Sequence, residues 1–146
     1  MILHNVYLGL GTNLGDKEEN MQGALLNIEK RIGSLMACSA FYVTDPVGFD
    51  SDNQFLNAAC WVTTSLEPLE LLTVTQQIEV EMGRASKSVN GVYSDRIIDI
   101  DILLYDDLQV DLPQLKLPHP HILKRDFVRL PLQEIAADAI DWLENR

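Results

Sequence analysis

The hydrophobic and polar residues of this chain follow two periods, which divide it into strands and helices. Apolar and β-branched side chains concentrate in short runs typical of strands, at residues 5–10, 35–44, 54–64 and 96–105. Apolar residues three to four positions apart predict helices at residues 17–32, 67–82, 127–136 and 138–144. The order β-α-β-β-α-β, followed by C-terminal helical additions, predicts an α+β fold of the ferredoxin-like type. Such a fold has an antiparallel sheet with two helices on one face.

The ends of the two long helices carry local signals. Asp16 is expected to cap the first helix, with Glu19 at the position of a capping-box partner. Thr64 or Ser65 is expected to cap the second helix, and Pro68 suits its first turn. The stripes expected to face the core are Met21, Leu25, Ile28 and Ile32, then Leu69, Leu72, Thr75, Ile78 and Met82. The C-terminal helices should close the core with Leu130, Leu132, Ile135, Ile140, Trp142 and Leu143.

The most apolar run also carries two carboxylates, Asp99 and Asp101. Side chains alternate along a strand, so both point to one face and are about 6–7 Å apart, while the isoleucines between and around them fill the other face. Two like charges at this spacing repel each other unless a cation lies between them. A divalent metal held by oxygen ligands is the natural candidate. The alternative is an edge-strand pair that faces water.

Length and composition indicate one domain over residues 1–146. No apolar run approaches the roughly 18 residues of a membrane span, and the N-terminus lacks the basic and apolar regions of a signal peptide. Cys38 and Cys60 are too few for a disulfide framework or a zinc site, and we expect both to be buried thiols. The sequence therefore predicts a cytoplasmic protein.

The charges are unevenly distributed. A net charge of −11 argues against general binding to nucleic acid or to an anionic membrane. Residues 1–83 carry 3 Lys or Arg against 11 Asp or Glu, whereas residues 84–129 carry 7 of each. This pattern fits a protein that handles a small, highly charged anion. The alternative is chance clustering on a solvated surface.

Three further stretches are open to two interpretations each. Phe55 and Asn57 share one face of a strand, where the amide is either a buried, satisfied group or a reader of a flat heterocycle stacked on Phe55. The turn at residues 11–16 either cradles phosphate or simply joins a strand to a helix, and it lacks the Lys-Ser/Thr ending of a P-loop. The polar loop at residues 84–95 is either an ordinary connection or a lid, which we favour.

Several of these motifs occur together in one known family. They are Gly11-Thr12-Asn13-Leu14-Gly15, Phe55-Leu56-Asn57-Ala58-Ala59, Gly83-Arg84, Arg96-Ile97-Ile98-Asp99-Ile100-Asp101-Ile102-Leu103, and Leu117-Pro118-His119 through Arg125-Asp126-Phe127. In this order they resemble the 6-hydroxymethyl-7,8-dihydropterin pyrophosphokinases of the folate pathway. The resemblance covers about residues 5–136. It implies transfer of the β,γ-pyrophosphoryl group of ATP to the hydroxymethyl group of the pterin, leaving AMP.

The resemblance also implies a role for individual residues. Asp99 and Asp101 match the carboxylates that hold two Mg²⁺ ions, and with Arg84 and Arg96 they form the expected catalytic set. The residues expected to contact ATP are Gln76, Glu79, Arg84, Lys87, Tyr93, Arg96, Ile102, His119 and Arg125. Those expected to contact the pterin are Thr44, Pro46, Val47, Gly48, Phe55, Asn57, Asp99 and Phe127. The implied partners are these two small molecules, with no nucleic acid and no membrane, and the chain is expected to be a monomer.

The chemistry expected of such a transfer agrees with these residue types. Metal ions and arginines stabilise the charge of the phosphates, and aromatic faces with a few polar groups hold a flat, neutral ring. The chain departs from the family pattern at Ser86, Tyr93 and Pro120, which affects individual ATP contacts. His4 and His121 are expected to be incidental, with His4 frayed or exposed, and Arg129, Lys116 and Lys124 are expected to be surface charges. Two other functions stay open, a non-catalytic binding module that holds a cation and a metal-dependent phosphohydrolase.

Overall fold

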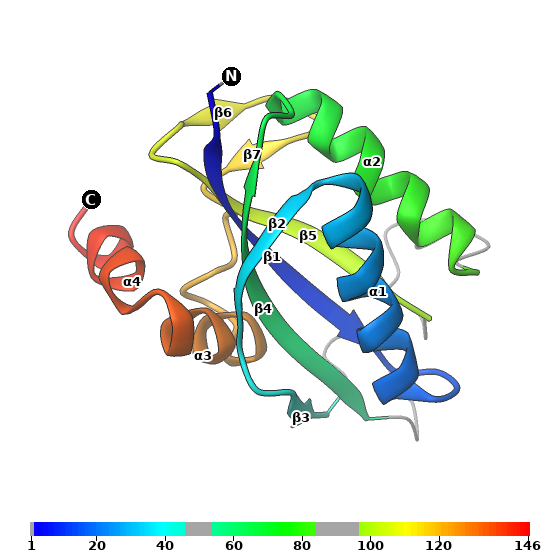
Figure 1. Ribbon diagram of the computed structural model, residues 1–146. Helices are drawn as coiled ribbons and strands as arrows, with labels where there is room; N and C mark the ends of the chain where they lie inside the picture. The colour runs from blue at the N-terminus through cyan, green and yellow to red at the C-terminus, as the bar shows by residue number, and fades with distance from the viewer. Residues whose placement is uncertain (1, 46–53, 84–96) are drawn as a thin grey trace.

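The computed structural model describes residues 2–45, 54–83 and 97–146 of the 146-residue chain (Figure 1). Its elements are β1 (His4–Thr12), α1 (Lys17–Arg31), β2 (Gly33–Cys38), β3 (Tyr42–Thr44), β4 (Phe55–Thr64), α2 (Pro68–Glu81), β5 (Asp99–Tyr105), β6 (Val110–Asp111), β7 (Lys116–Leu117), α3 (Asp126–Ile135) and α4 (Ala137–Glu144). This order contains the predicted β-α-β-β-α-β arrangement, with one additional short strand between β2 and β4.

The main sheet is antiparallel, with its long strands in the order β2-β4-β1-β5. Strand β3 pairs with the start of β4, beyond the segment that β2 covers. Strands β6 and β7 form a separate two-stranded sheet. The central strand β1 thus lies between β4 and β5, which carry the Phe55–Asn57 and Asp99–Asp101 motifs. The ferredoxin-like fold class predicted from the sequence is confirmed.

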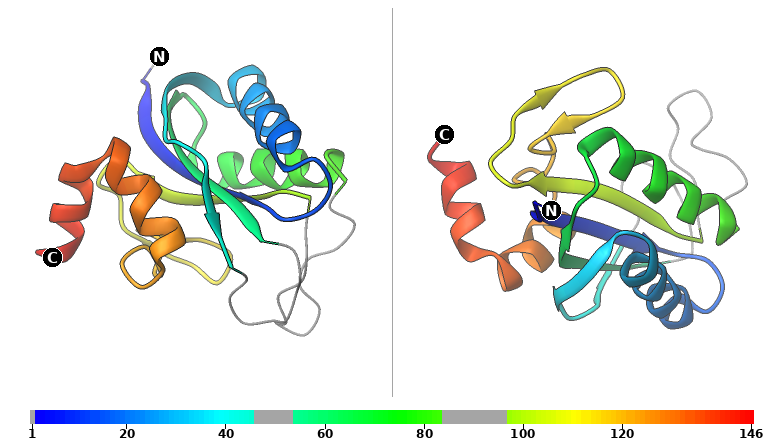
Figure 2. Two further views of the ribbon diagram at one scale, coloured as in Figure 1. Left: turned by 90° about the horizontal axis from the view of Figure 1, so that it is seen from below. Right: turned by 45° about the horizontal axis from the view of Figure 1, so that its top comes forward.

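Helices cover both faces of the sheet. Helices α1 and α2 lie side by side on one face, and α3 and α4 lie on the other (Figures 1 and 2). Side chains of α1 and α2, such as Met21, Ile28 and Ile78, pack with inward residues of the sheet into one core cluster. A second cluster joins Leu132 of α3 and Ile140 of α4 to the opposite face. The candidate chemistry lies on this second face.

Local details of the fold differ from the sequence prediction in three places. The strand predicted at residues 35–44 is two strands, because Ser39 lies between them and uses its hydroxyl to accept the Ala59 N–H and to donate to the Ala40 carbonyl. Helix α2 is capped by Glu67 in a capping box with Glu70, not by Thr64 or Ser65. Three side chains predicted to be in the core are exposed instead, namely Leu69, Leu130 and Trp142. The Asp16 cap of α1 is confirmed by its bond from the Glu19 N–H.

Some expectations about individual histidines and cysteines also change. His4 is not frayed, because its Nδ1 lies 2.7 Å from the Asp106 carboxylate. Cys60 is buried as expected, but Cys38 is only half-buried. The two cysteines are direct partners across β2 and β4, and both are free thiols. Within the described ranges, no helix is long and apolar enough to cross a bilayer.

Candidate active site

Three neighbouring strands bring Asn57 and Asp99 into one row across the sheet. Both residues are direct partners of Gly11 on the central strand β1, Asn57 from β4 and Asp99 from β5. Directly opposed residues of antiparallel strands point to the same face, so the amide and the carboxylate stand on either side of a residue without a side chain. Adjacent strands are about 4.8 Å apart, which places the two Cα atoms about 10 Å from each other. In the next row Gly9 is the partner of Asp101.

This row lies on the side of the sheet that α3 and α4 cover. Ala59 and Leu103 share its parity along β4 and β5, and both belong to the core cluster formed with α3 and α4. Phe127 is in the first turn of α3 and lines a pocket together with Thr44, whose hydroxyl is bonded to Asn57. Asn57, Asp99 and Phe127 therefore lie on the same side of the sheet, although they come from distant parts of the sequence.

The Asp99–Asp101 strand has the predicted alternation. Both aspartates are half-buried, whereas Ile98, Ile100 and Ile102 are buried in the cluster of α1 and α2. The isoleucines anchor β5 in the core, so the carboxylates are held on the opposite face. Because the Ile102 side chain is 4% exposed and points away from the aspartates, any contact that it makes with ATP would involve its backbone.

Helix α2 fixes the same strand from its outer edge. Glu79 is buried, and its Oε2 accepts a hydrogen bond of 2.8 Å from the Ile100 N–H. Strand β5 is at the edge of the sheet, so this carboxylate satisfies an outward-pointing backbone group midway between the two aspartates. Gln76, three residues earlier, is half-buried on the same face of α2. Glu79 therefore has a direct structural link to the carboxylate strand.

His119 is held as a neutral hydrogen-bond donor. Its backbone N–H donates to the Leu103 carbonyl at 2.9 Å, and its Nδ1 accepts from the His121 N–H at 3.2 Å. With Nδ1 occupied as an acceptor, the proton of the neutral ring is on Nε2. Burial, together with the neighbouring His121 and Arg125 and against the opposing effect of Asp99, lowers the pKa of His119 to about 4. At neutral pH the ring therefore offers an N–H without a positive charge.

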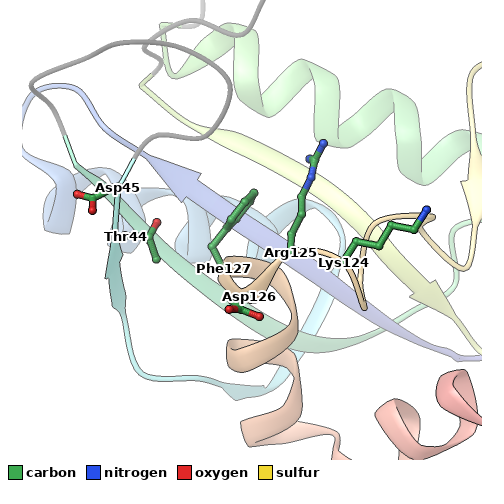
Figure 3. Close-up of a pocket in the computed structure, with 6 residues that line it drawn as sticks. All are labelled: Thr44, Asp45, Lys124, Arg125, Asp126 and Phe127. Carbon is green, nitrogen blue, oxygen red and sulfur yellow. The ribbon is translucent and has the colours of Figure 1, made fainter.

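A pocket of about 320 Å³ opens between the end of β3 and the start of α3. Figure 3 shows Thr44 and Asp45 on one side and Arg125 and Phe127 on the other. The Arg125 guanidinium lies 5.8 Å from the centroid of the Phe127 ring. The pocket thus combines an aromatic wall, which suits a flat ring, with charges of both signs, because Asp45 and Asp126 line it as well as Arg125. Lys124, expected to be an incidental surface charge, also lines it.

Asn57 has a defined orientation. It is 4% exposed, and its Nδ2 donates a hydrogen bond of 2.6 Å to the Thr44 hydroxyl. Strand β3 carries Thr44 and is itself held by Glu134 of α3, whose carboxylate accepts from the Tyr42 hydroxyl at 2.5 Å and from the Ala40 N–H at 2.9 Å. The sequence analysis did not identify Glu134 or Tyr42 as supporting residues, because α3 and β3 are far apart in the sequence.

The sequence prediction placed Gly11 in a turn rather than in β1 and gave Gly9 no role, although these glycines leave a sequence signal. Gly9 and Gly11 alternate with Leu8 and Leu10, so one face of the strand is apolar and the other is bare. Glycine is depleted in strands and often marks a place where another group approaches the backbone closely. The alternation of glycine and leucine is visible in the sequence. The sequence does not show that the glycine face of β1 is also the face that carries the Phe55–Asn57 and Asp99–Asp101 motifs.

Seven of the predicted site residues lie outside the described ranges. They are Pro46, Val47 and Gly48 of the predicted pterin loop and Arg84, Lys87, Tyr93 and Arg96 of the predicted ATP site. Ser86 and the predicted lid at residues 84–95 also lie outside them. Pro120, the other departure from the family pattern, is exposed beside His119.

The acidic groups of the site suit a hard metal ion that keeps other ligands. Residues 2–45, 54–83 and 97–146 contain no cluster of three or more His, Cys, Asp or Glu able to hold a metal alone. Mg²⁺ is usually bound through one or two carboxylates, with water and substrate phosphates completing six oxygen ligands. Asp99 and Asp101, half-buried on one strand face, fit this donor set. They do not fit zinc, whose sites in proteins use histidine or cysteine ligands.

Comparison with known proteins points to one family. The sequence model of the family described as 7,8-dihydro-6-hydroxymethylpterin-pyrophosphokinase (HPPK) matches residues 7–137. A 2-amino-4-hydroxy-6-hydroxymethyldihydropteridine pyrophosphokinase from Porphyromonas gingivalis is 49% identical over 132 residues, covering 90% of each chain. The protein of the same name from Bacillus subtilis is 42% identical over 130 residues, covering 88% of this chain and 76% of its own.

Solved structures agree on the fold. An HPPK-DHPS structure in complex with substrates matches 92% of this chain with a TM-score of 0.70 and 16% sequence identity. Wild-type HPPK-DHPS from Plasmodium falciparum with SDX-DHP matches 90% with a TM-score of 0.69 and 19% identity. This chain spans 40% of the length of each of those chains.

The fold and the comparisons identify a ferredoxin-like enzyme domain, a transferase of phosphorus-containing groups. The chain belongs to the 7,8-dihydro-6-hydroxymethylpterin-pyrophosphokinase family. The family resemblance inferred from the sequence motifs is thereby confirmed.

Proposed function

We propose that this chain transfers the β,γ-pyrophosphoryl group of ATP to the hydroxymethyl oxygen of 6-hydroxymethyl-7,8-dihydropterin at the site formed by β1, β4, β5 and the start of α3. One P–O bond to the AMP portion breaks, one P–O bond to the pterin oxygen forms, and the hydroxyl proton is released. The products are the pterin diphosphate and AMP. As a member of its family, the chain is a pyrophosphokinase of folate biosynthesis.

The observation that carries this proposal is the row Asn57–Gly11–Asp99. A group that recognises the edge of a heterocycle and a group that binds metal and phosphate stand on the same face, about two strand spacings apart. A pterin placed against Asn57 has its substituent directed across Gly11 toward Asp99. The acceptor hydroxyl and the phosphates therefore meet over the bare backbone of β1, a geometry that positions both reactants for transfer.

The pterin side of the site is formed by aromatic and amide groups. Phe55 and Phe127 supply the faces between which a flat ring stacks. Within the described part of the chain, Asn57 Oδ1 has no hydrogen-bond donor, while its Nδ2 is bound to Thr44. A buried acceptor without a donor is costly, so Asn57 Oδ1 favours a ligand with an N–H on its edge, as the 2-amino-substituted pterin ring has. The family pattern adds Pro46, Val47 and Gly48 to this side.

The phosphate side is formed by charged groups and by His119. Bound to Asp99 and Asp101, Mg²⁺ would neutralise phosphate charge and lower the pKa of the attacking hydroxyl. Neutral His119 is proposed to donate its Nε2–H to a phosphate oxygen, and Arg125 to pair with another. The family pattern assigns Arg84, Arg96, Lys87 and Tyr93 to ATP, with Gln76 and Glu79 beside the nucleotide.

Two other functions predict different results. A binding module with a cation at the aspartates would show no turnover. A metal-dependent phosphohydrolase would release phosphate from ATP with water as the acceptor, whether or not the pterin is present. The Asn57 amide and the aromatic wall of the pocket favour the transferase, because neither alternative requires a site for a heterocyclic acceptor in addition to a nucleotide.

The deciding experiment follows nucleotides by phosphorus NMR with protein, ATP, Mg²⁺ and the hydroxymethyl pterin. Formation of AMP that requires the pterin supports the proposal. ADP, pterin-independent phosphate or no turnover contradicts it. The same reaction with Ca²⁺ or with chelator in place of Mg²⁺ tests the proposed metal.

The Asp99→Asn variant tests the carboxylate strand. We expect turnover to fall by at least about 10³-fold, since a neutral amide cannot replace a metal-binding carboxylate, with an unchanged melting temperature. Asp107→Asn is the matched control, because Asp107 is exposed in the turn after β5. Retained activity of Asp99→Asn at saturating Mg²⁺ would remove Asp99 from the metal site.

The remaining proposals concern the setting of the enzyme. We propose that it acts as a monomer in the cytoplasm, on its two small-molecule substrates alone. The unpaired thiols of Cys38 and Cys60, opposite each other across β2 and β4, fit a reducing compartment. Sedimentation equilibrium at micromolar concentration tests the monomer, and a dimer would contradict it.

A further inference from the structure

Gly11 occupies the centre of the site, and its lack of a side chain is a matter of space. Among the described glycines, positive φ values occur at Gly15 and Gly83, so the backbone at Gly11 is accessible to any residue. A Cβ atom added at Gly11 would lie 3.2 Å from Asn57 Oδ1 and 3.7 Å from Phe55 Cδ1. Glycine weakens a strand, so its presence here is explained by what a side chain would touch.

The group that a Cβ would displace cannot easily move aside. Asn57 is buried, and its Nδ2 is bound to the Thr44 hydroxyl at 2.6 Å. Rotating the amide to relieve a contact at Oδ1 would lengthen this bond. A methyl group at position 11 must therefore shift the amide by a few tenths of an ångström, or leave the amide in place and occupy the space above the β1 backbone next to it. Either change alters the position at which Asn57 meets a ligand.

We propose that Gly11 is a specificity-determining residue for the pterin: its bare backbone fixes the depth at which the ring lies against β1 and keeps Asn57 Oδ1 in register with the ring edge. This inference rests on the proposed function. It assigns no part to Gly11 in ATP binding, because a Cβ there would meet only Asn57 and Phe55 within the described residues. A substitution at this position should therefore separate the two substrates.

The test is the Gly11→Ala variant, with binding measured by calorimetry for the hydroxymethyl pterin and for a non-hydrolysable ATP analogue. We expect the Kd of the pterin to rise by at least about tenfold, the loss expected from one hydrogen bond plus a steric contact, and the Kd of the ATP analogue to change by less than about twofold. In turnover, the KM for the pterin should rise while the KM for ATP stays constant. Equal losses for both ligands, or wild-type pterin binding, would overturn the proposal.

Gly9→Ala is the matched control. Gly9 lies on the same strand and face, and a Cβ there would be 3.4 Å from the Leu103 side chain, which is ordinary van der Waals contact. Because a Cβ at Gly9 would meet Leu103 and neither Asn57 nor Phe55 within the described residues, we expect the pterin Kd to stay at the wild-type level. A rise in the pterin Kd equal to that of Gly11→Ala would show that any alanine in β1 has the same effect, and would overturn a specific role for Gly11.

A double-mutant cycle with Asn57→Ser covers the case in which Gly11→Ala is poorly folded. Serine removes Oδ1 and makes room for the added methyl group. If Gly11 acts through Asn57, Gly11→Ala should cost much less pterin affinity in the Asn57→Ser background than in the wild type. The double variant should also have the same melting temperature as Asn57→Ser alone. Additive losses would overturn the proposal. Wild-type enzyme without pterin-dependent AMP formation would instead overturn the proposed function, so the two failures are distinguishable.

Discussion

The Thr44→Val substitution removes one hydroxyl group and almost no volume from the site. In the wild type this hydroxyl accepts the Asn57 Nδ2–H at 2.6 Å, and Asn57 is 4% exposed. Valine cannot accept a hydrogen bond, so the variant leaves a buried donor without its partner. It therefore isolates the bond that orients Asn57, with the shape of the side chain kept.

The expected cost follows from the burial of the donor. A buried polar group left unsatisfied costs about 1–3 kcal/mol. Because Thr44 is half-buried and water reaches its side of the bond, we expect the lower part of this range, about 1–2 kcal/mol. With a urea m value of about 2 kcal/mol/M, the unfolding midpoint should fall by about 0.5–1 M. The Kd of the pterin should rise by about five- to tenfold, because the released amide is no longer held toward the ligand.

Urea unfolding monitored by circular dichroism measures the first effect, and pterin calorimetry measures the second. Thr44→Ser is the control, because it retains the hydroxyl while losing a methyl group, and it should keep most of the pterin affinity. A Thr44→Val protein with a wild-type midpoint and wild-type pterin Kd would refute the reasoning. It would mean that this bond does not hold the amide in solution.

Two predictions concern pH. The pKa of His119 in the fold is about 4, against an ordinary value of 6.5, so the unfolded chain takes up this proton first and stability should fall as pH decreases from 6.5 to 4. His119→Gln should flatten this dependence by up to about 1.4 kcal/mol per pH unit in urea titrations, and equal slopes would contradict it. The Tyr42 hydroxyl and the Ala40 N–H lower the pKa of Glu134, so its contribution is present above the ordinary carboxyl range and lost as pH falls through it. Tyr42→Phe should therefore lower the melting temperature at pH 7 more than at pH 3. An equal loss at both pH values would contradict a stabilising role of the ionised Glu134 carboxylate.

Much of the fold could be predicted because each element carries its own signal. The isoleucines around Asp99 and Asp101 specify a strand with one buried face, and the structure places them so. The predictions that failed depended on neighbours that the sequence does not reveal. Leu130 and Trp142 have the right spacing for a core stripe but are exposed, because α3 and α4 lie at one end of the sheet and cover only part of it. Glu67 replaces Thr64 as the cap of α2, because the helix begins at Pro68 and the Thr64 hydroxyl instead donates to the Ile32 carbonyl and accepts from the Leu66 N–H.

The sequence by itself determined that Asp99 and Asp101 share a face, that Phe55 and Asn57 share a face, and that seven of the eleven Lys and Arg residues lie in residues 84–129, the segment that contains both aspartates. These are properties of one strand or one segment, and a period of two fixes them. Only the tertiary structure decided that the two faces are the same face, with Gly11 between them. The reason is physical: the order β4-β1-β5 and its register follow from packing the whole sheet against α1 and α2, and no local pattern encodes which strands become neighbours.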